Sequence, residues 1–444
     1  MDPHTYQHRC SPQPPGGLAG GGLAGDGLAA LPAVRIADGV RTGEWRAVDV
    51  VAAALARIER VEPTLHAFIE VWAEEALRQA REVDVRVAAG ARLPLAGVPI
   101  GVKGRAGIRT AVARALMAAG CVPVGATSVP GPGTPWQTWG LGAGGRTVNP
   151  WCPDRTPGGS SAGSAAAVAT GLVPMATGTD GAGSVRIPAA WCGVVGLKTT
   201  NGRLPSADRT GLASPGILTR HASDAATYWR CVSVVGGESG MGFEPGAGFV
   251  GVVPSSPLTA LWSPDLGFAD PDPGPASAAH GAALRLADSG LVRLVRPDES
   301  VRLEDPAAAW LALRGAARSD SAAVRAAQAI RAENDRRLAA LFSDADLLLT
   351  PTTPNAPHGH EGPGDRYSTS LTWAFNLSGH PALSIPAGIT SDGCPVGLQL
   401  VARHGEEELL LRVAEAAEAA HASPAPPAIP TSTPDPQPEA EHPA

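Results

Sequence analysis

Lysine is almost absent from this sequence. Two of its 35 basic residues are lysine, Lys103 and Lys198, and the remaining 33 (35 − 2) are arginine. Arginine cannot lose its proton inside a protein, whereas a lysine removed from water can become a neutral base. Each lysine is therefore a candidate for chemistry that arginine cannot perform, and chance survival or a simple ion pair is the alternative.

Cysteine is scarce as well, and no two cysteines form a CxxC pair. This spacing argues against a zinc site or a disulfide framework and indicates structural thiols in a reducing cytoplasm. The six cysteines are Cys10, Cys121, Cys152, Cys192, Cys231 and Cys394.

Long apolar runs and long basic runs are both missing. No uninterrupted apolar stretch has the length that crosses a bilayer. With no Lys/Arg-rich run and a net charge of −7, the chain has no electrostatic footprint for nucleic acid. Residues 1–16 lack the basic and apolar regions of a secretory signal. We expect a cytoplasmic protein without a membrane or nucleic-acid partner.

The composition is otherwise that of an ordinary soluble protein, with 44% hydrophobic and 17% charged residues among 444. Residues 1–30 are rich in glycine and proline, and residues 422–444 are rich in proline and acidic. Both segments are predicted to be disordered tails, which leaves residues 31–421 as the folded domain.

Strand-like and helix-like segments alternate along that domain, which predicts an α/β fold. Helices are predicted at 45–61, 72–88, 109–119, 161–170, 223–234 and 406–420, and strands at 94–103, 121–125, 249–253, 346–351, 382–387 and 396–401.

Two glycine–serine loops dominate the central stretch, residues 156–203. They span 158–161 and 181–184 and are joined by an alanine-rich helical segment and a short apolar run. Glycine permits close approach of other groups, consecutive N–H groups can hold developing negative charge, and serine can attack or relay a proton. Lys103 ends a predicted strand, where its side chain can be held rigidly. The pattern predicts that the two loops form the base of a catalytic site.

Other readings of these loops fit less well. A P-loop needs a lysine after the glycines, and a dinucleotide fingerprint needs GxGxxG, and neither pattern is present. The segment 159–163 has one residue too many for a nucleophile elbow. A metal hydrolase needs clustered ligands, and the nearest approach is His358 with His360 in a polar loop.

Six sequence blocks stand in order along the chain: PLAGVPIGVK, NPWCPDRTPGGSSAGSAAAVA, GTDGAGSVRIPAAWCGVVGLK, DADLLLTPTTP, FNLSGHPALSIPAG and PVGLQLVAR. In these blocks the chain resembles the amidase signature family, serine hydrolases of C–N bonds, and the resemblance covers roughly residues 32–420. It implies one large domain, in which a mixed twisted sheet is flanked on both faces by helices. It also implies a Ser–cis-Ser–Lys triad, with Ser184 as nucleophile, Ser160 after a cis peptide and Lys103 as base.

The resemblance implies further site residues and no cofactor. Backbone N–H groups of Gly181, Ala182, Gly183 and Ser184 would form the oxyanion hole, and Ser161, Asp180 and Arg186 would brace the loop, with ordinary structural polarity as the alternative. Trp136 and Trp139 would wall the acyl pocket, with core packing as the alternative, and Lys198 would be structural.

The sequence departs from the family pattern at three places. Gly104 follows Lys103 where the family usually has an acidic residue, the stretch up to Arg109 is shortened, and Ala182 occupies a position that is often glycine. If that position required a positive φ, alanine would add about 1 kcal/mol of strain.

We therefore expect a cofactor-free amidase that forms an acyl-enzyme with a small-molecule linear amide. Two alternatives remain open. One is the A-type subunit of a tRNA-dependent amidotransferase, which usually has glutamine where this chain has Ile187. The other is a degenerate member retained for binding. The oligomeric state, with a homodimer among the options, is also open.

Overall fold

The computed structural model describes residues 26–236, 257–295, 301–315 and 321–420. Its strands form one 11-stranded mixed sheet in the order β1-β3-β2-β4-β6-β5-β10-β11-β9-β7-β8. The strands are β1 Phe68–Val71, β2 Pro99–Lys103, β3 Val122–Thr127, β4 Met175–Asp180, β5 Val195–Lys198, β6 Ser214–Thr219, β7 Leu258–Trp262, β8 Val292–Val295, β9 Leu347–Pro351, β10 Ala382–Ile389 and β11 Pro395–Val401.

Parallel and antiparallel pairs occupy different parts of this sheet. Strands β3, β2 and β4 are parallel, as are β9, β7 and β8, whereas the pairs from β4 through β6, β5, β10 and β11 to β9 are antiparallel. Parallel pairing requires crossover connections, and helices supply them here.

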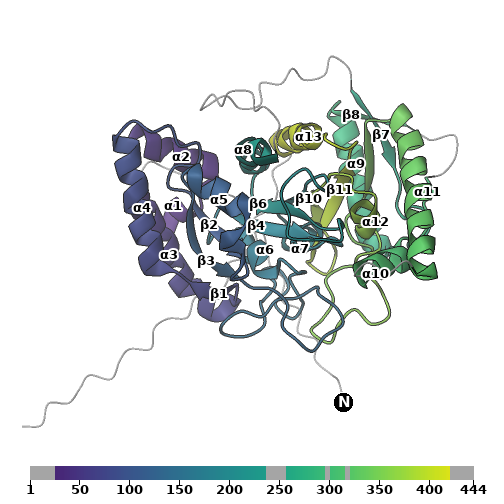
Figure 1. The fold of residues 1–444 in the computed structure, drawn as a ribbon, viewed down its shortest axis with the longest axis horizontal. Helices are drawn as coiled ribbons and strands as arrows, with labels where there is room; N and C mark the ends of the chain where they lie inside the picture. The colour runs from purple at the N-terminus through teal and green to yellow at the C-terminus, as the bar shows by residue number, and fades with distance from the viewer. Residues whose placement is uncertain (1–25, 237–256, 296–300, 316–320, 421–444) are drawn as a thin grey trace, which may run out of the picture.

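Helices cover both faces of the sheet, as Figure 1 shows, with α6 and α7 on one face and α8, α9 and α13 on the other. The helices are α1 Asp26–Ala29, α2 Ala33–Thr42, α3 Ala47–Leu65, α4 Ala73–Ala88, α5 Ala111–Ala118, α6 Ala162–Ala169, α7 Arg186–Cys192, α8 Ala222–Val232, α9 Pro273–Asp288, α10 Ala307–Gly315, α11 Ala322–Asp344, α12 Trp373–Leu377 and α13 Glu407–Ala420, with 3-10 turns at Gly107–Arg109 and Ser233–Gly236. The predicted α/β fold, a mixed sheet with helices on both faces, is confirmed.

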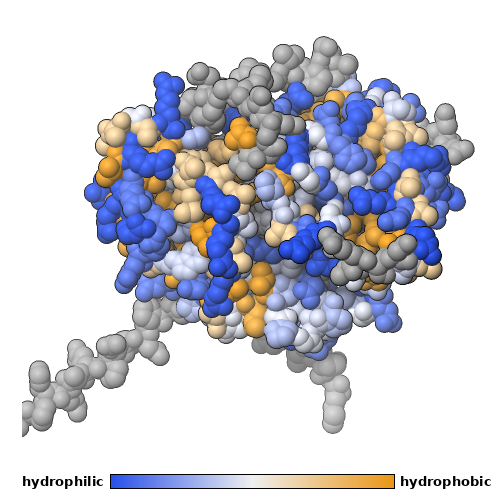
Figure 2. All heavy atoms as spheres, viewed as in Figure 1, coloured by the Kyte–Doolittle hydropathy of each residue, from blue (hydrophilic) through white to orange (hydrophobic). Residues whose placement is uncertain are grey.

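The small side chains of α6 explain why it lies so close to the sheet. All eight residues of this helix, AGSAAAVA, are buried, and it contacts β4, β6, β2 and β3. In contrast, α4 and α11 lie at the outside of the molecule, and their outward surfaces are largely hydrophilic in Figure 2. Apolar residues at helical spacing on one side and charges on the other produce this orientation.

Segments that are distant in sequence close the fold next to α8. The Asp224 carboxylate accepts the N–H groups of Ala33 at 3.0 Å and Val34 at 3.1 Å, and so satisfies the start of α2. From α13, Glu418 accepts the N–H of Ala222 at 2.6 Å. Within the described ranges, no helix combines the length and the apolar character needed to cross a membrane.

One predicted strand starts later in the structure. Strand β2 begins at Pro99 rather than at residue 94, and the short helix α1 spans Asp26–Ala29. The predicted strand at 249–253 and the tail at 422–444 lie outside the described residues.

Candidate active site

The parallel pairing of β2 with β4 brings Lys103 next to the two glycine–serine loops. Ile100 pairs with Met175 and Gly101 with Ala176, so both strands end at the same edge of the sheet. The Lys103 N–H donates to Thr177 Oγ1 at 3.0 Å and fixes the last residue of β2 against β4.

The Lys103 amine contacts the first loop directly. Its Nζ lies 2.9 Å from Ser160 Oγ and donates to Thr179 O at 3.1 Å. The peptide bond between Gly159 and Ser160 is cis. Burial lowers the pKa of Lys103 to about 7, while Asp180 acts in the opposite direction. A lysine with this pKa is neutral in a large fraction of molecules near pH 7.

Ser184 belongs to the second glycine–serine loop, which a backbone hydrogen bond connects to the first. The Ser161 N–H donates to Ser184 O at 3.2 Å. Ser184, Ser160 and Lys103 line the same cavity. Within the described part of the chain, the Ser184 hydroxyl makes no hydrogen bond, so it is available to a bound substrate.

One of the four N–H groups expected to form the oxyanion hole already donates a hydrogen bond within the protein. The Gly183 N–H donates to Asp180 Oδ1 at 2.7 Å, which corrects the expectation for that group. The N–H groups of Gly181, Ala182 and Ser184 have no acceptor in the described part of the protein. Among the described residues, Ala182 is not one of the non-glycine positions with a positive φ, so the strain considered for this alanine does not arise.

Asp180 and Arg186 form a fully buried ion pair next to the second glycine–serine loop. Arg186 Nη2 donates to Asp180 Oδ1 at 2.9 Å and Nε donates to Oδ2 at 3.0 Å. Burial alone would raise the pKa of Asp180, but the Arg186 guanidinium holds it well below its usual range. The same carboxylate accepts the N–H groups of Val185 and Arg186, so it organises the backbone around Ser184.

Ser161 contributes to this bracing only through its backbone. Its Oγ is buried and has no hydrogen-bond partner among the residues that the structure describes. Lys198, also fully buried, donates to Thr199 O, Asn201 Oδ1 and His380 O at 2.8–3.0 Å. Burial lowers the pKa of Lys198 to about 7, but Lys198 is not among the residues lining the cavity.

Three further residues complete the network, and the sequence analysis did not single them out. Arg186 Nη1 donates to Gln399 Oε1 at 2.6 Å, and Nη2 donates to Asn376 Oδ1 at 2.6 Å. Thr372 Oγ1 donates to Ala182 O at 2.6 Å. Asn376 and Gln399 lie inside two of the motif blocks, which was the available signal, whereas Thr372 lies just before one of them.

The cavity has a volume of about 560 Å³, enough for a small organic amide. Trp136 lines it, as expected. Trp139 does not: its side chain is 7% exposed, its Nε1 donates to Thr134 Oγ1, and its backbone lies against Gly159. Trp310, Tyr367 and Trp373 supply the other aromatic walls and were not predicted.

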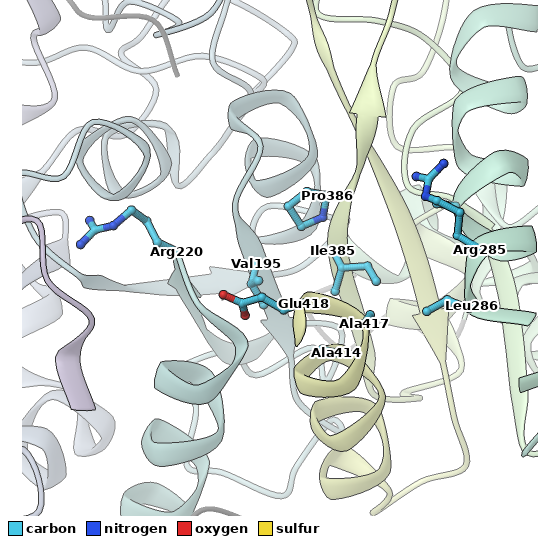
Figure 3. Close-up of a pocket in the computed structure, with 10 residues that line it drawn as sticks. Val195, Arg220, Arg285, Leu286, Ile385, Pro386, Ala414, Ala417 and Glu418 are labelled. Atoms are coloured by element: carbon cyan, nitrogen blue, oxygen red, sulfur yellow. The ribbon is translucent and has the colours of Figure 1, made fainter. Parts of the chain in front are cut away.

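A second cavity and a pair of histidines were also considered as sites. A cavity of about 60 Å³ lies between α9, α13 and β10. Figure 3 shows Arg220 and Arg285 at its opposite ends, and both guanidinium groups donate to backbone carbonyls. In the described ranges, no three His, Cys, Asp or Glu side chains are grouped to hold a metal ion. His358 instead bonds Thr138 Oγ1.

A family model, relatives in sequence and a solved structure each match most of this chain. The family model described as Amidase matches residues 49–111, 105–235 and 296–411. AmiA2 of Mycobacterium tuberculosis (strain ATCC 25618 / H37Rv), a protein named as an amidase, is 36% identical over 431 residues, covering 82% of this chain and 88% of AmiA2. The A-type subunit of glutamyl-tRNA(Gln) amidotransferase from Synechococcus sp. (strain WH7803) is 32% identical, covering 84% of this chain and 94% of that protein. The solved structure of 6-aminohexanoate cyclic dimer hydrolase in complex with substrate superposes with a TM-score of 0.70 at 28% identity. The superposition covers 88% of this chain and 97% of that chain.

Proposed function

Because this chain belongs to the amidase signature family, we propose that it hydrolyses a small-molecule linear amide through an acyl-enzyme on Ser184. The observation that carries the proposal is the contact of Lys103 Nζ with Ser160 Oγ at 2.9 Å, in a cavity that Ser184 shares. Residues 31–421 would form the catalytic unit, in a cytoplasmic enzyme whose cysteines are thiols.

In the proposed first step, neutral Lys103 accepts a proton from Ser160 while Ser160 accepts the proton of Ser184. The Ser184 Oγ then attacks the carbonyl carbon of the amide. The resulting oxyanion is bound by the N–H groups of Gly181, Ala182 and Ser184, which have no acceptor among the described residues. The ion pair of Asp180 with Arg186 keeps these groups oriented, so they need no rearrangement during the reaction.

Collapse of the tetrahedral intermediate breaks the C–N bond. The proton held by Lys103 returns through Ser160 to the leaving nitrogen, which departs as an amine or ammonia. Water then attacks the ester on Ser184 and gives up a proton by the same route. The carboxylate product leaves, and Ser184 recovers its hydroxyl.

A fluorophosphonate probe tests the nucleophile and the base together. Wild type is expected to be labelled, Ser184→Ala to be unlabelled, and Lys103→Ala to be labelled at least 100-fold more slowly. Ser289→Ala, which removes an exposed hydroxyl at the end of α9, is the control and should be labelled like wild type. Equal labelling of Ser184→Ala and wild type would reject the assignment.

The amidotransferase component is the second candidate, favoured by the relative of that name. In such a complex the same chemistry would release ammonia for a partner subunit. Ile187, where glutamine is usual, is 1% exposed and packs with Ala190 and Trp191. This apolar packing favours the free-standing amidase, and co-purification with a partner subunit would favour the alternative.

A further inference from the structure

The cavity over Ser184 contains a guanidinium group that the proposed mechanism does not use. Arg314, near the end of α10, lines the cavity together with Lys103, Ser160 and Ser184. Its Nη1 lies 3.7 Å from the position that a Cβ on Gly181 would occupy. The cation therefore lies against the loop that leads into the nucleophile.

Trp310 positions α10 and this cation against the loop. Trp310 Nε1 donates to Gly181 O at 2.7 Å, which anchors the helix to the second glycine–serine loop. Arg314 follows four residues later, so both side chains lie on the same side of the helix. Its Cζ lies 5.3 Å from the centroid of the Trp310 ring, within the range of a cation–π contact.

Arg314 has no acidic partner among the residues that the structure describes. No described carboxylate forms an ion pair with it, and it makes no hydrogen bond there. The other arginine of the cavity, Arg366, is paired with Asp272 at 2.6 Å. Asp365, the acidic residue of the lining, is exposed. An unpaired guanidinium presents a planar fork of donors that matches a carboxylate.

Three aromatic side chains, Trp310, Tyr367 and Trp373, line the same cavity as Arg314. The ring centroids of Trp310 and Trp373 are 6.2 Å apart, and those of Tyr367 and Trp373 are 5.0 Å apart. Such walls favour a planar ring, which can stack on them with little loss of conformational freedom. The lining thus combines a surface for an aromatic ring with a cation available to a negative group.

We propose that the enzyme acts on amides of aromatic compounds that carry a carboxylate, and that Arg314 is the specificity-determining residue that binds this carboxylate. The inference rests on the proposed function for the bond that is cleaved. Beyond that function, the inference specifies that the substrate carries a negative charge and an aromatic ring. The carboxylate belongs either to the acyl half or to the amine half of the amide, and the experiment separates the two.

The kinetic test compares each carboxylate with a neutral isostere that has a nitro group in its place. The pairs are 4-acetamidobenzoate with 4-nitroacetanilide, for the amine half, and 4-carbamoylbenzoate with 4-nitrobenzamide, for the acyl half. In one pair, the ratio of kcat/KM for carboxylate over nitro should fall about ten-fold or more in Arg314→Gln, chiefly through KM. Arg314→Lys should recover part of that loss. Arg81→Gln, an exposed arginine on α4, is the control and should leave both ratios at their wild-type values. Ratios that stay unchanged in Arg314→Gln for both pairs would overturn the proposal.

A binding test separates this inference from the hydrolytic function. The two carboxylates are titrated calorimetrically into Ser184→Ala and into Ser184→Ala/Arg314→Gln. About ten-fold weaker binding of one of them by the double variant supports the role of Arg314, even where wild type hydrolyses none of the four amides. Equal affinities, or binding of neither carboxylate by Ser184→Ala, overturn it, even where hydrolysis and probe labelling are intact.

Discussion

At the scale of single residues, the proposed base Lys103 sets the pH dependence that we expect of the site. Its amine lies 2.9 Å from Ser160 Oγ, and burial lowers its pKa to about 7. Asp180 raises this pKa and Arg314 lowers it, so the value reflects both charges as well as desolvation. A base is most useful when its pKa lies near the working pH, because it is then largely neutral and still basic.

Activity should consequently depend on the ionisation of Lys103. As the pH rises through about 7 the amine loses its proton, so kcat/KM should increase about ten-fold per pH unit below that value and level off above it. Lys103→Arg should lose at least 100-fold at every pH, because arginine stays protonated. The measurement is kcat/KM for an amide between pH 5 and pH 9. A profile that is flat across this range would contradict the role of the amine.

At the scale of elements, the approach of α6 to the sheet depends on Gly163. A Cβ at this position would lie 2.0 Å from Ala67 O and 2.3 Å from Ser128 N. Both atoms belong to the backbone and cannot move aside without displacing the strands and loops around them. The first glycine–serine loop leads directly into α6, so the placement of Ser160 depends on this close contact.

Gly163→Ala should therefore destabilise the fold by about 3 kcal/mol or more, because it overpacks a rigid site. Gly274 offers a matched control, since it is also the second residue of a helix, α9. A Cβ there would meet only Thr390 Cγ2 at 3.7 Å, an ordinary contact. Gly274→Ala should be neutral or stabilising by about 0.5–1 kcal/mol. Urea denaturation measures both, and similar effects for the two variants would contradict this account.

At the scale of the whole molecule, α8 joins the beginning and the end of the described chain. Asp224 accepts two N–H groups at the start of α2, and Glu418 of α13 accepts the N–H of Ala222. Burial raises the pKa of Asp224 from its ordinary 3.8 to about 6, because the charged carboxylate is removed from water. The folded protein therefore binds a proton on Asp224 more tightly than the unfolded chain does.

This shift makes the stability of the fold depend on pH. Between about pH 4 and pH 6 the folded protein holds a proton on Asp224 that the unfolded chain has lost, so the stabilisation is complete below pH 4 and declines as the pH rises through 6. Asp224→Asn removes the titration. The free energy of unfolding of wild type relative to Asp224→Asn should fall by about 1–3 kcal/mol from pH 4 to pH 7. Asp288→Asn, on the exposed side of α9, controls for the loss of a carboxyl. A difference that does not change with pH would contradict the shift.

Much of the site could be predicted because its residues lie in local patterns. Lys103 was singled out as one of two lysines at the end of an apolar strand, and the two glycine–serine loops by their composition. Strands β1 and β4 to β8 were not predicted from periodicity, since short strands such as VGLK carry no clear alternation. Helix α2 was also missed, although Ile36, Ala37 and Val40 form a buried face at helical spacing. The wrong assignment of Trp139 to the pocket wall has a similar cause, because spacing in a loop says nothing about which way a ring points.

The sequence alone determined the family, the α/β alternation and the identity of the three candidate catalytic side chains, because these depend on residue types and on short spacings along the chain. Only the tertiary structure decided that Asn376 and Gln399 support Arg186, and that Arg314 stands unpaired among the described residues that line the cavity. These contacts join residues up to 213 positions apart. Which of many such pairs meet is settled by the packing of the whole sheet and its helices.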